Sequence, residues 1–243
     1  TITFALIFLA LGSFLLTSTV KLWREGGKQV EGANTIQPND IVYNKNIYVL
    51  IYDPLLDNGQ KLSEYMNWEN PDTLVAQYID WLKTTTNNKV SVVVGTRNEI
   101  ADFPTFTDGS KYDQTTYLAC WNSSKCLKDS SGMMLAMDYN LALKKFAICE
   151  YFNSKSIDEV WVLGAPNMGV VANAQTGTKS SSDTIKIISG TSCNKPMNIM
   201  GFDFEKQLSS ITDNEPLALQ KSPDTEFNID NKSLFVIGEG AFA

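Results

Sequence analysis

Ile47-Tyr-Val-Leu-Ile-Tyr52 is a continuous apolar run that decides the fold class of this 243-residue chain. A run with no polar alternation is typical of a strand that is buried on both faces of a parallel sheet. Val90-Ser-Val-Val-Val94 and Val160-Trp-Val-Leu163 have the same character further along the chain. We therefore predict three buried strands, over 47–52, 90–94 and 160–163.

Amphipathic segments separate these strands. After Pro71-Asp72, apolar residues recur at helical spacing as far as Leu82, which predicts a helix with Asp72 as its N-cap. Residues 133–153 predict a second helix, and the polar stretch 96–132 is expected to be a long irregular loop. Strands that alternate with helices predict an α/β domain, a mostly parallel sheet flanked by helices, over residues 47–243.

The last third of the chain gives weaker signals. Residues 172–183 are rich in Ser, Thr and Gly and predict a loop. The remaining expected elements are strands over 184–188, 198–200 and 234–237 and a helix near 204–211.

Thr1 to Val20 is uncharged and mostly apolar, and Lys21, Trp23 and Arg24 follow it at once. Roughly 20 apolar residues of helix span the ~30 Å hydrocarbon core of a bilayer, and such flanks anchor a helix at the interface. We predict an N-terminal hydrophobic helix over 1–24, either a membrane anchor or a packing helix, and a linker over 25–46. A cleavable signal peptide is the alternative, although Thr17-Ser-Thr19 is a poor cleavage site.

Four cysteines, all beyond this segment, indicate the compartment. An even number of cysteines after a hydrophobic leader is typical of disulfides in an oxidising compartment. The chain contains no Cys-x-x-Cys pair, so the cysteines do not indicate a zinc site. The expected location is extracytoplasmic, at the cell surface, and three pairings remain open for Cys120, Cys126, Cys149 and Cys193.

Polar residues at the predicted strand ends are the candidate ligand-binding residues, because ligands collect beyond the carboxyl ends of parallel strands. Asp53 and Glu99 suggest a carboxylate pair for general acid/base chemistry or glycoside hydrolysis, and Arg97 suggests a clamp for an anion. Asn167 follows the third strand in the Gly164-Ala-Pro-Asn loop. The alternative is structural: Asp53 caps a turn and Arg97 is a solvated surface charge.

Two tryptophans are further candidates, because aromatic rings in loops stack on sugars. Trp68 and Trp121 fall in predicted loops, whereas Trp81 and Trp161 fall on predicted elements and are expected in the core. A calcium site from Asp102, Asp108 and Asp113 is the bolder interpretation of the long loop, and a solvated acidic loop is the plainer one. We expect no metal and no cofactor.

Histidine is absent, and this excludes a Ser-His-Asp triad, a His-ligated metal and an imidazole base. Phosphate-binding glycine loops are absent too. The net charge of −7 has the wrong sign for nucleic acid.

Several phrases resemble an uncharacterised α/β domain of secreted bacterial proteins. The most specific is Asp158-Glu-Val-Trp161 running into Gly164-Ala-Pro166. The resemblance implies an extracytoplasmic α/β domain and no established activity. Its members tend to carry a histidine after the Gly-Phe segment, where this chain has none. The other resembling phrases are Trp68-Glu-Asn-Pro-Asp72, Phe103-Pro104, Asp108-Gly109 with Tyr112, and Met200-Gly-Phe-Asp-Phe-Glu205.

Together these observations favour a membrane-tethered or secreted cell-surface protein with a binding or assembly role. Its expected partners are the membrane, through residues 1–24, and a surface protein, a glycan or further copies of the chain. A membrane-anchored hydrolase using strand-end carboxylates is one alternative. A pilin-like filament subunit packed through the N-terminal helix is the other.

Overall fold

The computed structural model describes residues 43–178 and 185–205. All described residues belong to one compact unit, which lies within 41–243. The predicted N-terminal helix over 1–24, almost all of the linker over 25–46, and the strand over 234–237 lie outside the described residues. Within the described ranges, no helix is both long enough and apolar enough to cross a membrane.

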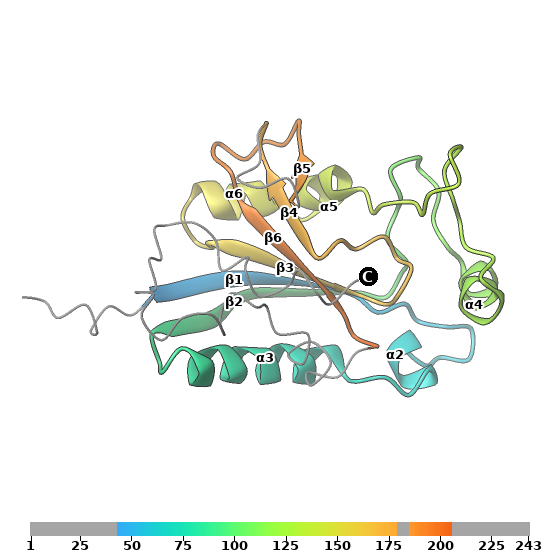
Figure 1. Cartoon of the computed structure of the whole chain (residues 1–243), viewed down its shortest axis with the longest axis horizontal. Coiled ribbons are helices and arrows are strands. Elements are labelled where there is room, and N and C mark those ends of the chain that lie inside the picture. Colours follow the sequence, from blue (N-terminus) through green and yellow to red (C-terminus); the bar gives the residue numbers. More distant parts are fainter. Residues whose placement is uncertain (1–42, 179–184, 206–243) are drawn as a thin grey trace, which may run out of the picture. The chain divides into compact units, whose positions relative to one another are not determined.

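A six-stranded mixed sheet forms the centre of the domain (Figure 1). Its strands are β1 (Tyr43–Tyr52), β2 (Val90–Ile100), β3 (Glu159–Gly164), β4 (Asn173–Thr176), β5 (Lys186–Ile188) and β6 (Asn198–Asp203), in the order β2-β1-β3-β6-β4-β5. Strands β2, β1, β3 and β6 run parallel to one another. Strand β4 is antiparallel to β6, and β5 is parallel to β4. The predicted mostly parallel α/β fold is confirmed, with two reversed strands at one edge.

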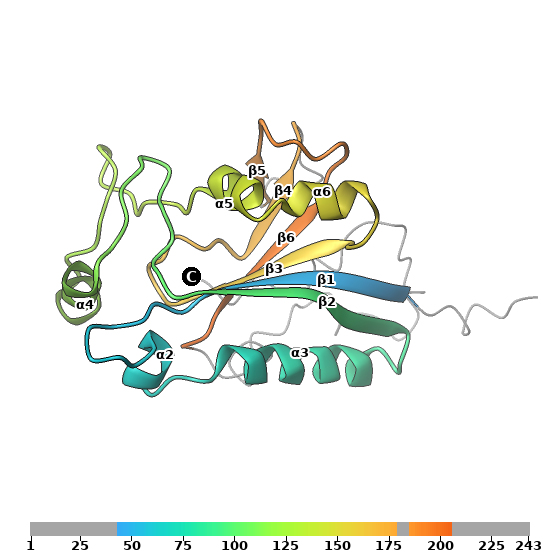
Figure 2. The ribbon, with the colours of Figure 1, turned by 180° about the vertical axis from the view of Figure 1, so that it is seen from behind.

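Helices cover both faces of the sheet. They are α2 (Leu62–Tyr65), α3 (Pro71–Thr85), α4 (Gln114–Ser123), α5 (Tyr139–Lys145) and α6 (Ile148–Asn153). Figures 1 and 2 show α3 on one face, α5 and α6 on the other, and α2 and α4 beyond the carboxyl ends of β1 and β2. The N-cap of α3 is Asn70, which accepts from the N–H groups of Asp72 and Thr73. Asp72 was therefore the wrong prediction for the cap and lies in the first turn instead.

An aromatic cluster fixes α3 against the sheet. The ring of Tyr78 lies 5.3 Å from that of Trp161 on β3 and 5.1 Å from that of Phe202 on β6. Trp161 is 1% exposed, and Trp81 stacks on Tyr78 at 5.6 Å. The prediction of a core position is confirmed for Trp161, whereas Trp81 is partly buried and packs against the core.

Strand β2 is longer than predicted, and the prediction that 90–94 is buried was wrong, because β2 is an edge strand in which Val93 and Val94 are exposed. It continues from Val90 to Ile100 and pairs with β1 over its whole length, across a register shift near Gly95. Arg97 and Glu99 therefore lie within the strand and not beyond its end. These residues were predicted to lie in a loop because they are polar, but an edge strand can carry polar residues that solvent satisfies.

The prediction of one helix over 133–153 was wrong. Residues 133–137 are not helical, and Ala147, with φ of 51°, separates α5 from α6. The predicted loops also hold regular structure, because α4 lies within 96–132 and β4 within 172–183. Short elements such as these depend on tertiary packing more than on local periodicity.

Two disulfides link segments that lie outside the sheet. Cys120 pairs with Cys126 at the end of α4, and Cys149 of α6 pairs with Cys193, in the segment before β6. Asn153 supports the second link, since its side chain donates to the carbonyl of Ser192 and accepts from the N–H of Asn194. The predicted disulfides are confirmed, and they fit an extracytoplasmic protein.

Candidate functional site

Asp53 follows β1, as predicted, but its carboxylate is enclosed. The residue is 1% exposed and accepts from Ser63 twice, from the backbone N–H at 2.9 Å and from the hydroxyl at 2.6 Å. Burial raises the pKa of Asp53, and the Ser63 bonds and the charge of Lys61 oppose that rise only in part. Both carboxylate oxygens are thus used to hold α2 against the end of β1.

Arg97 and Glu99 are two residues apart on β2, so their side chains lie on the same face of the sheet. Arg97 binds Asp72 of α3 with two hydrogen bonds, Nε to Oδ1 and Nη2 to Oδ2, each 2.6 Å long. Glu99 is paired with Arg97 at 2.7 Å and with Lys61. Burial opposes ionisation of Glu99, but hydrogen bonds from Lys61 and Arg97 together outweigh it and lower the pKa of that carboxyl.

The structure therefore brings three of the predicted residues together. Glu99 lies near enough to Asp53 to raise the pKa of that buried acid. Every charge in the group has a partner, since Asp72 and Lys61 complete a chain from α3 through β2 to α2. The group links these elements, and each of its carboxylates is already bonded to another residue of the domain.

Asn167 lies apart from that group, in the loop after β3. Its backbone is left-handed, with φ of 64°, and it lines a pocket of about 440 Å³ together with Met168 and Asp203. Tyr117 of α4 donates to the carbonyl of the neighbouring Pro166 at 3.0 Å. This loop is held by α4 and not by the residues around Asp53.

Trp68 and Trp121 meet in space although they are far apart in sequence. Their rings are edge to face with centroids 5.1 Å apart, and Trp68 also lies 5.9 Å from buried Phe204. Trp68 is in a loop, as predicted, whereas Trp121 is on α4. Both rings are partly buried, so much of their surface is used for packing.

The three aspartates considered for calcium each have a separate partner. Asp102 pairs with Lys111 at 2.6 Å, Asp108 accepts from Ser110, and Asp113 caps α4. In the part of the chain that the structure describes, no three acidic or cysteine side chains gather as a metal site would require.

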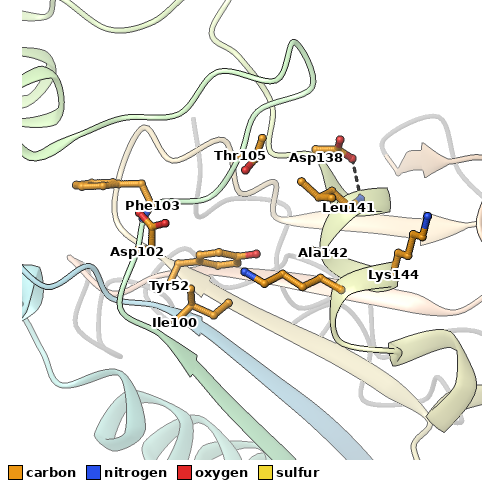
Figure 3. A pocket seen from close by; sticks show the side chains of 10 residues that line it. Tyr52, Ile100, Asp102, Phe103, Thr105, Asp138, Leu141, Ala142 and Lys144 are labelled. Atoms are coloured by element: carbon orange, nitrogen blue, oxygen red, sulfur yellow. Dashed lines mark hydrogen bonds between the residues drawn. The ribbon is translucent and has the colours of Figure 1, made fainter.

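A pocket that the sequence analysis did not predict opens beyond the carboxyl ends of β1 and β2 (Figure 3). Its volume is about 550 Å³, within the range of roughly 300–1,000 Å³ that is usual for small-molecule sites. Tyr52 and Ile100, paired in register at the ends of the two strands, form its floor. The walls are the loop Asp102, Phe103 and Thr105, and Asp138, Leu141, Ala142, Lys144 and Lys145 of α5 and its N-cap.

Tyr52 is the central polar residue of this pocket, which we call the Tyr52 pocket. The residue is 6% exposed, and Figure 3 shows its hydroxyl directed into the cavity toward α5. Within the described part of the chain the hydroxyl has no hydrogen-bond partner, and its oxygen is not among the fully buried polar atoms, so it is open to solvent in the cavity. Burial, together with the charges of Asp102 and Asp138, raises the pKa of Tyr52, so the phenol stays protonated.

Asp138 presents the second uncommitted polar atom. Its Oδ1 accepts from the N–H of Leu141 at 3.0 Å and caps α5, which leaves Oδ2 without a partner among the described residues. The N–H of Asp138 donates to the carbonyl of Thr105 at 2.8 Å, and this bond fixes the two walls relative to each other. The sequence analysis missed Asp138 because it placed the residue inside a continuous helix, where a capping role is invisible.

Lys144 and Lys145 supply positive charge at the rim. Both are exposed in the last turn of α5, and no carboxylate of the described residues lies within salt-bridge distance of either. Asp102, in contrast, is neutralised by Lys111. The ammonium group of Lys145 also lies over the ring of Phe146, 5.3 Å from its centroid. The charges around the cavity that lack an oppositely charged partner among the described residues are therefore one carboxylate and two ammonium groups.

Comparisons with known protein families, with curated proteins and with solved structures found no match to this chain. The geometry of the site therefore carries the functional argument alone.

Proposed function

We propose that this chain is an extracytoplasmic binding protein of the cell surface, and that the Tyr52 pocket is its ligand site. The observation that carries the proposal is the hydroxyl of Tyr52, which opens to a cavity of about 550 Å³ and bonds no other described residue. The hydroxyl is open to solvent in the cavity, so a ligand there can bond it in place of water. The position beyond the ends of parallel strands is the usual place for ligands in such sheets.

Binding is better supported than hydrolysis by the predicted carboxylates. A general acid or base must reach its substrate, whereas Asp53 is 1% exposed with both oxygens bonded to Ser63. Glu99 is held by two cations. These contacts favour a structural role for both acids.

The cell-surface location is supported by the two disulfides and by the resemblance to secreted bacterial domains. We propose that residues 1–24 attach the chain to a membrane. Extraction of native membranes with alkaline carbonate tests this attachment, since an integral anchor stays in the pellet and a cleaved leader leaves the chain in the supernatant. The filament alternative depends on the same residues, and no contact of the described domain favours it.

The pocket is tested by ligand-observed NMR on the full chain in mild detergent. The panel contains neutral and acidic monosaccharides, amino acids and dipeptides. Leu141, which is 45% exposed and lines the cavity, is changed to Trp to fill it. Leu55→Trp is the matched control, because Leu55 is 56% exposed and lies outside the cavity lining. We expect a ligand that loses binding to Leu141→Trp alone. A panel without such a ligand overturns the proposal.

A further inference from the structure

The polar groups of the Tyr52 pocket specify what kind of ligand fits, an inference that rests on the proposed function. Tyr52 offers a hydroxyl that both donates and accepts, Asp138 offers an oxygen that only accepts, and Thr105 has a hydroxyl with no partner among the described residues. Figure 3 shows Thr105 and Asp138 on one side of the cavity and Tyr52 on the other, with the carboxylate of Asp138 bonded to the N–H of Leu141.

Ligand hydroxyls can pair with every group of this set. A hydroxyl donates to Asp138 and accepts from Tyr52, whereas an ammonium group cannot accept and a carbonyl cannot donate. Neighbouring hydroxyls, as on a sugar ring, would bond two of the three groups at once. The apolar walls, which include Ile100, Leu141 and Ala142, suit the C–H face of such a ring.

Charge adds a second requirement at the other end of the cavity. With Asp102 paired to Lys111, the charges without an oppositely charged partner among the described residues are the carboxylate of Asp138 and the ammonium groups of Lys144 and Lys145, of which Lys145 also packs over the ring of Phe146. The excess of one positive charge favours a ligand with one negative group near the last turn of α5. Lysine ammonium groups on flexible stems can follow such a group at the rim of a site.

We infer that the Tyr52 pocket binds a saccharide unit that carries a carboxylate, such as a uronic acid residue. Its hydroxyls would bond Tyr52, Thr105 and Asp138, and its carboxylate would lie beside Lys144 and Lys145.

The test is an NMR titration of the full chain with glucuronate, glucose, glucose 6-phosphate and serine as probes. We expect glucuronate to bind, and Tyr52→Phe, which removes only the hydroxyl, to weaken it about tenfold. Asp138→Asn should weaken it as well while its amide oxygen still caps α5. Tyr65→Phe and Asp80→Asn are the matched controls, because both residues are exposed and lie outside the cavity lining.

Charge is tested by the double variant Lys144→Met/Lys145→Met, with Lys83→Met/Lys89→Met as the control. The advantage of glucuronate over glucose should disappear in the first variant and shrink at high salt, since exposed charges are screened.

Equal binding of glucose and glucuronate to the native chain overturns the inference, as does preferred binding of glucose 6-phosphate or of serine. These outcomes leave the proposed function intact if Leu141→Trp still abolishes binding. If Leu141→Trp binds glucuronate as the native chain does, the proposed function fails too.

Discussion

Ser63 donates a hydrogen bond to each carboxylate oxygen of Asp53, from its N–H to Oδ1 at 2.9 Å and from its hydroxyl to Oδ2 at 2.6 Å. Both residues are buried, at 3% and 1% exposed, so water does not compete for these bonds. The pair links the first residue after β1 to the short helix α2. A strand-end acid that looks catalytic in the sequence is thereby a structural link.

Ser63→Ala should lower the free energy of unfolding. The change removes one donor from a buried carboxylate, and a hydrogen bond to a charged group contributes about 1.5–3 kcal/mol. Urea unfolding followed by tryptophan fluorescence measures the loss. Ser131→Ala is the control, because Ser131 makes the same hydroxyl bond to Asp129 on an exposed surface and should matter little. Equal effects of the two changes would contradict the assignment of Asp53 as a buried link.

Asp53 and Glu99 should affect the pH dependence of stability with opposite signs. The folded pKa of Asp53 is raised above its ordinary 3.8, so the stability it contributes is complete below 3.8 and is lost as pH rises through the folded pKa. The folded pKa of Glu99 is lowered below its ordinary 4.5, so its contribution is present above 4.5 and is lost as pH falls through the folded pKa.

Urea midpoints at a series of pH values measure both effects. Relative to the native chain, Asp53→Asn should gain stability as pH rises from acid to neutral, and Glu99→Gln should lose it. Two variants that change in the same direction with pH would show that at least one of the two pKa shifts has the wrong sign.

The disulfides should differ in their contribution to stability. Cys149–Cys193 spans 44 residues and Cys120–Cys126 spans 6, and a longer closed loop restricts the unfolded chain more. The chain-entropy relation gives about 4 kcal/mol for the long loop and about 2 kcal/mol for the short one. Double alanine variants of each pair, compared by urea unfolding, should reproduce that order. The reverse order would mean that contacts in the native state outweigh loop entropy here.

Gly201 should tolerate no side chain. A Cβ at this position of β6 would lie 2.1 Å from the carbonyl oxygen of Val171, which is backbone and cannot swing away. We expect Gly201→Ala to lower the free energy of unfolding by about 3 kcal/mol or to prevent folding. Gly95→Ala is the control in β2, because its nearest contact would be an ordinary 3.7 Å. Thermal unfolding by circular dichroism compares the two, and a stable Gly201→Ala would contradict this packing of β6.

Elements with a strong local signal could be predicted from the amino-acid sequence alone. The apolar runs at 47–52 and 160–163 are buried strands because continuous apolar residues have no alternative to a sheet covered on both faces. The helix after Pro71 follows from its periodicity and its proline at the first turn. The even cysteine count indicated disulfides, although not their pairing.

Which polar residues are available depends on how segments pack against one another in the folded chain. Asp53, Arg97 and Glu99 are satisfied by Ser63, Asp72 and Lys61, all of which come from helices that the chain order does not place beside them. Tyr52 reads as one more apolar position of β1, and Asp138 as part of a helix. Their uncommitted atoms face one cavity because β1, β2 and α5 converge there, and such convergence depends on packing between segments distant in sequence.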